Sequence, residues 1–146
     1  MKYFKLTEEK IVNLWGVTLF RVELIIDCKW GKAGDKGGFV EKEENISDAW
    51  VYGNAWVYGN ARVSGDAQVY GNAQVYGDAW EKSPLQIQGT RHFFNICAKG
   101  YIQIGCIKKT FENWQTSFRS VGEEEGYSEE EITEYEMYIK LAISLK

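Results

Sequence analysis

The middle of the chain repeats a pattern of six residues. Small apolar side chains recur at this interval in two parallel series, which are Val51, Val57, Val63, Val69 and Val75, and Ala49, Ala55, Ala61, Ala67, Ala73 and Ala79. A strand alternates every two residues and a helix every 3.6, so neither alone explains the interval. Most units also carry a Gly-Asn or Gly-Asp pair, which favours a corner. The pattern predicts short strands joined by corners, with three strands completing a coil of roughly 18 residues in a parallel β-helix.

Each repeat has an inner and an outer side. Because side chains alternate along a strand, Ala and the Val two places later share one face, and both suit a narrow interior. A step of about 18 residues places Val51 beneath Val69 and Val57 beneath Val75. The same step would place Val63 at Glu81, where the pattern has ended. Fewer than two full coils give too little core to stand alone, so we expect the flanking segments to cap the repeats.

Large aromatic residues occupy the predicted outer positions. Rows of exposed rings usually mark contact surfaces, so we predict an oligomer interface formed by Trp50, Tyr52, Tyr58, Tyr70 and Tyr76. Two alternatives remain open at this point. The flanking segments of the same chain would cover the rings, or the rings would bind a ligand.

The repeat "VYGNA" resembles the hexapeptide-repeat proteins, although Tyr replaces the small or acidic residue usual at the second place. The resemblance implies a left-handed β-helix and a homotrimer. The segments "GDKGGFVEKEENIS" and "IQIGC…ENW", together with the tandem repeats, also resemble hexapeptide-repeat proteins of bacteriophages and prophages that have no assigned function. This second resemblance implies a phage origin and therefore the cytoplasm of an infected bacterium, and it supplies no catalytic residue.

The flanks predict additional strands and two helices. "YFKL" and "VTLFRVELII" have strand composition. Downstream, Lys99-Gly100 is the predicted turn of a hairpin. Thr110 is the expected N-cap of a helix, and its predicted apolar face is Phe111, Trp114, Phe118 and Val121. Ser128 and Glu131 predict a capping box for a second helix, which presents Ile132, Tyr135, Ile139 and Ala142.

These elements predict a mainly β protein. With the handedness that the resemblance implies, we expect a short left-handed parallel β-helix with N-terminal β-strands and a small C-terminal α+β cap. The expected divisions are an N-terminal β cap with a Gly-rich joint (1–44), the repeats (45–82), and a hairpin plus two helices (83–146).

The Gly-rich joint has two interpretations. Lys29, Lys32 and Lys36 fall within or beside "GKAGDKGG", where lysines and free backbone N–H groups would suit an anion. A nucleotide P-loop is excluded because no Gly-Lys-Ser/Thr follows at the needed spacing. The alternative is a tight connector that leads the N-terminal strands into the first coil.

Composition and charge limit the classes of partner that we expect. The 146 residues carry a formal net charge of −4, which gives no reason to expect nucleic acid. No apolar run is long enough to span a membrane, and the N-terminus lacks the apolar core of a signal peptide, so we expect a cytoplasmic protein. The three cysteines, Cys28, Cys97 and Cys106, form no paired spacing and are expected to be reduced.

Candidate catalytic chemistry is sparse. His92 is the single histidine, which excludes a three-histidine zinc site and leaves one candidate base for a hexapeptide acyltransferase. We therefore expect no enzyme activity, no metal and no cofactor. The favoured hypothesis is an oligomeric module that sequesters a nucleotide-like anionic host signal, with contacts from Lys32, Lys36, Trp56, Arg62 and Trp80. A scaffold that binds a host protein and an acyltransferase using His92 are the alternatives.

Overall fold

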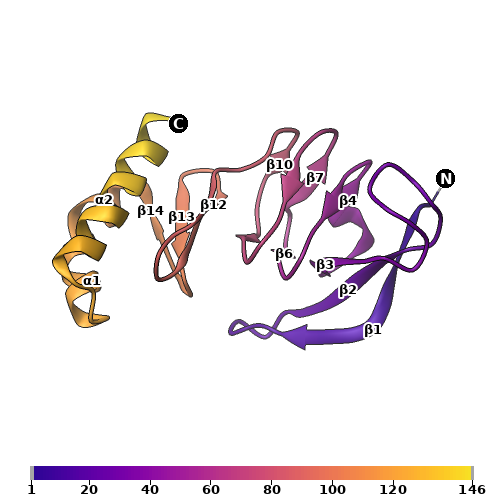
Figure 1. Cartoon of the computed structure of the whole chain (residues 1–146), viewed down its shortest axis with the longest axis horizontal. Coiled ribbons are helices and arrows are strands. Elements are labelled where there is room, and N and C mark those ends of the chain that lie inside the picture. The colour runs from indigo at the N-terminus through magenta and orange to yellow at the C-terminus, as the bar shows by residue number, and fades with distance from the viewer. Residues whose placement is uncertain (1, 146) are drawn as a thin grey trace. The chain divides into compact units, whose positions relative to one another are not determined.

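The computed structural model describes residues 2–145, which form two compact units divided between Pro84 and Leu85 (Figure 1). The first unit contains a short 3₁₀ helix (Glu43–Asn45) and ten strands, which are β1 (Phe4–Val12), β2 (Thr18–Leu24), β3 (Lys36–Val40), β4 (Ile46–Ser47), β5 (Trp50–Val51), β6 (Trp56–Val57), β7 (Arg62–Ser64), β8 (Gln68–Val69), β9 (Gln74–Val75) and β10 (Ala79–Trp80).

Short parallel strands of the first unit stack in three ladders, ordered β3-β6-β9, β4-β7-β10 and β5-β8. Val51 pairs with Val69 and Val57 with Val75, so the predicted step of one three-strand coil is confirmed for these two pairs. The stacked strands form a β-solenoid. Its inward positions are buried, and these are Val51, Ala55, Val57, Ala61, Val63, Ala67, Val69, Ala73 and Val75.

The step is one position shorter in one ladder. Ile46 pairs with Val63, and Val63 pairs with Trp80, which precedes the position given by the regular repeat. At the last corner Asp78 adopts the left-handed conformation with φ of 69°, whereas Gly takes that conformation at the four preceding corners. The left-handed residue has therefore moved one place along the chain. Ala79 is consequently exposed, contrary to its expected inward position.

Stacking begins earlier than the expected boundary at residue 45. Strand β3 pairs in parallel with β6, through Phe39 to Trp56 and Val40 to Val57. Gly37 and Gly38 lie in this strand, where an added Cβ would approach the carbonyl oxygens of Val51 and Ala55 to 2.4 and 2.6 Å. Glycine is therefore needed here for close packing, and this part of the Gly-rich segment is a strand of the solenoid.

The antiparallel hairpin β1–β2 extends the first ladder, because β2 also pairs with β3 in antiparallel orientation. Arg21 fixes this junction. Its guanidinium donates to a carboxylate oxygen of Glu9 at 2.8 Å and to the carbonyl oxygens of Gly37 and Gly53 at 2.7 and 3.2 Å. It also lies 4.2 Å from the centre of the Phe39 ring. The hairpin is thus held against the repeats by polar as well as apolar contacts.

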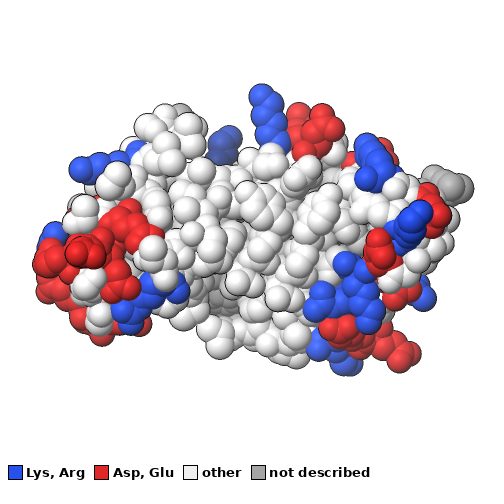
Figure 2. Space-filling view, in the orientation of Figure 1, with Lys and Arg blue, Asp and Glu red and all other residues white. Residues whose placement is uncertain are grey.

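The second unit is an antiparallel sheet packed with two helices. The strands are β11 (Gln86–Gln88), β12 (Phe93–Ala98), β13 (Tyr101–Ile104) and β14 (Ile107–Thr110), followed by α1 (Phe111–Glu124) and α2 (Glu129–Ser144). The predicted hairpin, the Thr110 N-cap and the Ser128–Glu131 capping box are all confirmed. The predicted apolar faces of both helices pack into one core with Phe94 and Ile102. Acidic side chains gather over the helices in Figure 2.

Candidate ligand-binding site

An open hollow of about 410 Å³ lies on the first unit beside the turn that follows β2. Lys29 and Trp30 line one side, and Tyr52, Asp66 and Gln68 line the other together with Gly65 and Ala67. The turn is tight, because the Cys28 and Gly31 backbones exchange hydrogen bonds of 2.8 and 3.1 Å. Lys29 and Trp30 therefore occupy its tip. A charged side chain and a large ring are presented together at this edge of the solenoid.

Neighbouring aromatic residues hold Trp30 in place. The centre of its ring lies 4.7 Å from that of Tyr3. The Tyr3 hydroxyl in turn donates to the Ala49 carbonyl at 2.8 Å and accepts from the Ala49 N–H at 3.1 Å. Burial raises the pKa of Tyr3, so its phenol remains a neutral donor. The Lys29 ammonium lies 4.9 Å from the centre of the Trp30 ring. The Trp30 ring is thus packed against Tyr3, while the Lys29 side chain is exposed beside it.

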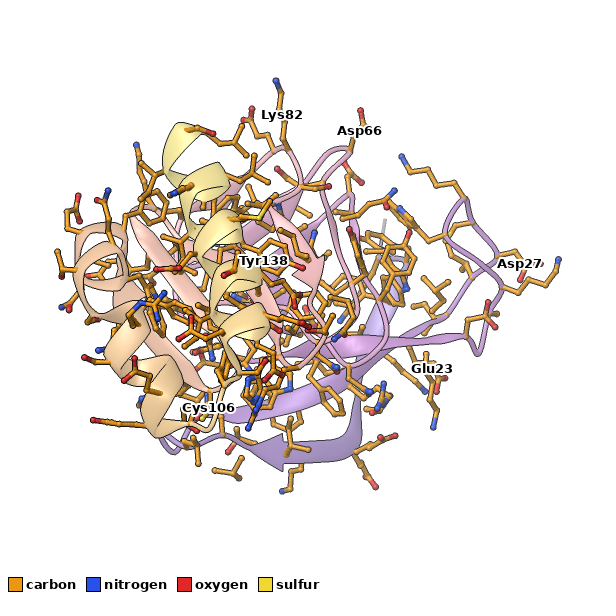
Figure 3. All side chains as sticks on the ribbon, turned by 60° about the vertical axis from the view of Figure 1, so that its left-hand side comes forward. Glu23, Asp27, Asp66, Lys82, Cys106 and Tyr138 are labelled. Carbon is orange, nitrogen blue, oxygen red and sulfur yellow. The ribbon has the colours of Figure 1, made fainter. Side chains whose placement is uncertain are left out.

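The opposite wall comes from the repeats. Tyr52 follows β5, and burial raises the pKa of its phenol. Gly65 and Asp66 form a corner, and Gln68 begins β8. Figure 3 shows Asp66 projecting from this corner. The hollow therefore offers one cation, two aromatic rings, a carboxylate and an amide. Such a set suits a small ligand that carries a flat ring, an anionic group and hydrogen-bond donors.

The residues predicted as ligand contacts are not gathered in one place. Lys36 lies 3.5 Å from a Glu9 carboxylate oxygen, and Lys32 is exposed in the loop. Trp56 packs beside the cluster of Leu19, Phe39 and Tyr58. None of these three lines the hollow beside Trp30.

The other two predicted contacts belong to the second ladder. Trp80 is on β10, and its indole N–H donates to the Gly77 carbonyl at 2.7 Å. Arg62 is on β7 and lines a separate hollow of about 240 Å³ with Lys42, Glu44 and Asn60. The predicted contacts therefore do not form a single site within one chain.

The predicted interface rings have different environments. Trp50 is only 2% exposed and contacts the rings of Tyr3 and Phe4, while Tyr58 is 6% exposed and packs with Leu19 and Phe39. The expectation that these two rings face a partner is corrected, because the N-terminal strands of the same chain cover them.

The three remaining rings are not covered in the same way. Tyr52 lines the hollow, and Tyr70 is exposed. Tyr76 is half-buried and lies 6.0 Å from Tyr58, measured between ring centres. These rings remain accessible to a ligand or partner to different degrees.

His92 belongs to the second unit. Its Nδ1 lies 2.6 Å from the Tyr127 hydroxyl, and it lines a cavity of about 30 Å³ that also includes Cys106 and Glu125. This volume holds about one or two water molecules and no acyl donor. Burial raises the pKa of Cys97 to about 12, which keeps that thiol protonated. Within residues 2–145, no group of three His, Cys, Asp or Glu side chains is placed to hold a metal.

Sequence reasoning missed Trp30, Asp66 and Gln68 as a set, and it named Lys29 only as one of several loop lysines. The segment "CKWG" carries the local signal, since Gly31 favours a turn and the preceding Lys29 and Trp30 would then lie at its tip. The pairing of this tip with Asp66 arises from stacking between coils and has no local signal.

Comparisons with known proteins bear on the repeats. No curated protein matches the chain. In the part that the structure describes, no helix has both the length and the apolar character needed to cross a membrane. Residues 49–65, 55–71 and 67–82 match the model of the YdcK beta solenoid repeat, so the repeat region is similar to that β-solenoid family.

Proposed function

We propose that this protein is a non-catalytic binding module that takes a small anionic, nucleotide-like ligand in the hollow beside Trp30. The observation that carries the proposal is the meeting of Lys29 with the rings of Trp30 and Tyr52 around one open volume. A phosphate would pair with the Lys29 ammonium, and a base would stack on an aromatic ring. Asp66 and Gln68 would bond to amino or hydroxyl groups of the same ligand, which offsets the repulsion between Asp66 and the phosphate.

The finer assignments belong to the same proposal. We infer a left-handed solenoid of the hexapeptide-repeat type that assembles as a homotrimer, on the strength of the "VYGNA" repeats. The resemblance to phage proteins supports a phage origin, and in an infected host a nucleotide-binding module would sequester a host signal, including one used in antiviral defence. The corner geometry supports the hexapeptide type of solenoid, because Gly53, Gly59, Gly65 and Gly71 share nearly one value of φ.

Calorimetry with mono-, di- and cyclic nucleotides tests the ligand. We expect micromolar binding to the wild type and at least about tenfold weaker binding to Lys29→Gln, because a charge-assisted hydrogen bond is lost. Lys32→Gln is the matched control, since Lys32 is an exposed lysine of the same loop that does not line the hollow.

Three results would contradict the proposal. If no nucleotide binds at micromolar concentration, the protein-binding scaffold replaces the ligand hypothesis. If Lys32→Gln weakens binding as much as Lys29→Gln, the loop and not the hollow supplies the contact. Acyl transfer from acetyl-CoA that is lost in His92→Ala would establish an enzyme instead.

A further inference from the structure

The turn of the β1–β2 hairpin exposes a compact apolar group. Val12, Leu14 and Trp15 are 65%, 78% and 48% exposed. We call these three residues the hairpin tip. Scattered exposed apolar residues are ordinary, but these three lie within four positions of the chain, and one of them is a tryptophan, a residue enriched at the centres of protein interfaces.

The hairpin tip has a fixed conformation. The side-chain oxygen of Asn13 accepts hydrogen bonds from the N–H groups of Trp15 and Val17 at 2.9 and 3.0 Å. The Asn13 N–H donates to the Val17 carbonyl at 3.0 Å, and Gly16 supplies the left-handed conformation with φ of 80°. Trp15 also stacks on Tyr58, with 6.4 Å between ring centres. Docking of this tip therefore costs little conformational entropy.

The charge pattern favours a second copy of this chain as the partner. No charged residue occurs from Ile11 to Phe20, although 26% of the chain is charged. In the proposed homotrimer, residues close to the three-fold axis meet their own copies, and a charge among them would face like charges. An uncharged patch avoids that penalty. In Figure 2, the area where Figure 1 places the end of this hairpin is white.

The surroundings of the hairpin tip argue against a lipid surface. Interfacial lipid binding normally combines apolar side chains with several cations. Strand β1 carries Glu8 and Glu9 as well as Lys10 where it approaches the tip. A rim with charges of both signs is typical of contacts between proteins.

We infer that the hairpin tip is the self-association surface of this protein. The inference rests on the homo-oligomer proposed above and is independent of the ligand. Trp50 and Tyr58, which were expected at the interface, are covered within the chain. The hairpin that contributes to this cover exposes its own apolar residues, so the contact surface lies on the hairpin and not on the buried rings.

Analytical ultracentrifugation of the full chain over about 1–100 µM tests the inference. The wild type should associate, and Leu14→Lys and Leu14→Ser should each weaken association at least about tenfold. The control is Met137→Lys, which changes another exposed apolar residue in the second unit and should leave association unchanged. Because Leu14 is largely exposed, both variants should retain the wild-type circular dichroism.

The outcomes separate this inference from the proposed function. If the wild type and both Leu14 variants associate equally well, the hairpin tip is not the self-association surface, and the proposed homo-oligomer is retained. A wild type that is monomeric throughout would overturn both. Monomeric protein that sediments with phosphatidylcholine–phosphatidylserine vesicles, and loses this property in Leu14→Lys, would assign the tip to lipid. Calorimetry on Leu14→Lys should show unchanged nucleotide binding.

Discussion

The two units of this protein bury their cores in opposite ways. In the first, the repeats form strands of only two or three residues, and these line an interior of valine and alanine. In the second, helices of 14 and 16 residues contribute Trp114, Phe118 and Tyr135 to the core. A narrow interior made of repeats admits small side chains only, whereas a sheet covered by helices admits large and irregular ones. Core composition therefore follows from backbone architecture and not from hydrophobicity alone.

The two units also satisfy the hydrogen bonds of their buried polar groups in different ways. In the solenoid, buried amides are satisfied mainly by backbone stacking, and Asn45 adds a side-chain bond of 2.7 Å to the Ala61 carbonyl. In the second unit, single side chains satisfy several groups. The Tyr135 hydroxyl donates to the His92 carbonyl and accepts from the N–H groups of Arg91 and His92. The first arrangement distributes its polar bonds over many positions, while the second concentrates them on a few.

The largest expected effect is that of a charge inside the solenoid. Val69 is fully buried and stacks on Val51, so Val69→Asp should destabilise the first unit by more than about 4 kcal/mol, because an unpaired carboxylate enters an apolar interior. Urea unfolding followed by circular dichroism measures this. Asn72→Asp is the control, since it places a carboxylate at an exposed corner. A stable, soluble Val69→Asp protein would refute the assigned interior.

A smaller effect tests whether the Gly-rich segment belongs to the solenoid. In Gly38→Ala the new Cβ would lie 2.6 Å from the Ala55 carbonyl oxygen, and we expect a cost of about 3 kcal/mol from overpacking. Gly34→Ala has open space but φ of 97°, so backbone strain alone should cost about 1 kcal/mol. Equal thermal stabilities of the two variants would show that β3 is a connector.

The smallest effect concerns the second unit and pH. The hydrogen bond from the Ser128 N–H lowers the pKa of Glu131 from 4.5. As the pH falls, Glu131 is therefore protonated first in the unfolded chain. Its stabilisation is complete above pH 4.5 and is lost as the pH falls through the lower pKa of Glu131 in the folded protein. Glu131→Gln retains a capping-box acceptor without the titration. Its helical signal should resist acidification to about pH 3 better than that of the wild type.

Glu130→Gln serves as the control for this titration. It removes a neighbouring exposed carboxylate that takes no part in the capping box, so it should keep the acid dependence of the wild type. Identical acid profiles for all three proteins would show that Glu131 does not contribute to the acid dependence of stability.

Patterns that repeat or that act locally were predictable from the sequence. The six-residue interval predicted the stacking of Val51 on Val69, and local capping signals predicted where both helices begin. Each of these depends on residues close in sequence or on a period read many times. The position of strand β3 was missed, because "KGGFV" has the composition of a loop and is recruited by pairing with distant β6.

The candidate site was less predictable than the fold. Its lysine was noted, but its walls come from a turn after β2 and a corner before β8, which only stacking brings together. The exposure of each aromatic ring also depended on where the hairpin packs. Tyr58 and Tyr70 occupy equivalent places in the repeat, yet one is buried and the other exposed. A repeat pattern cannot distinguish them, because the covering segment lies outside the repeats.

The three-ladder stacking assigns each repeat to a ladder by its distance along the chain. Val51 and Val69 occupy the same ladder because one complete coil separates them along the chain. A duplication of one complete coil would therefore add one layer and return every later strand to its own ladder. A duplication of a single repeat unit would instead advance every later strand by one ladder. Tandem duplication therefore preserves the ladder assignment only when whole coils are added. Duplication of a single repeat unit would change the ladder of every strand that follows it.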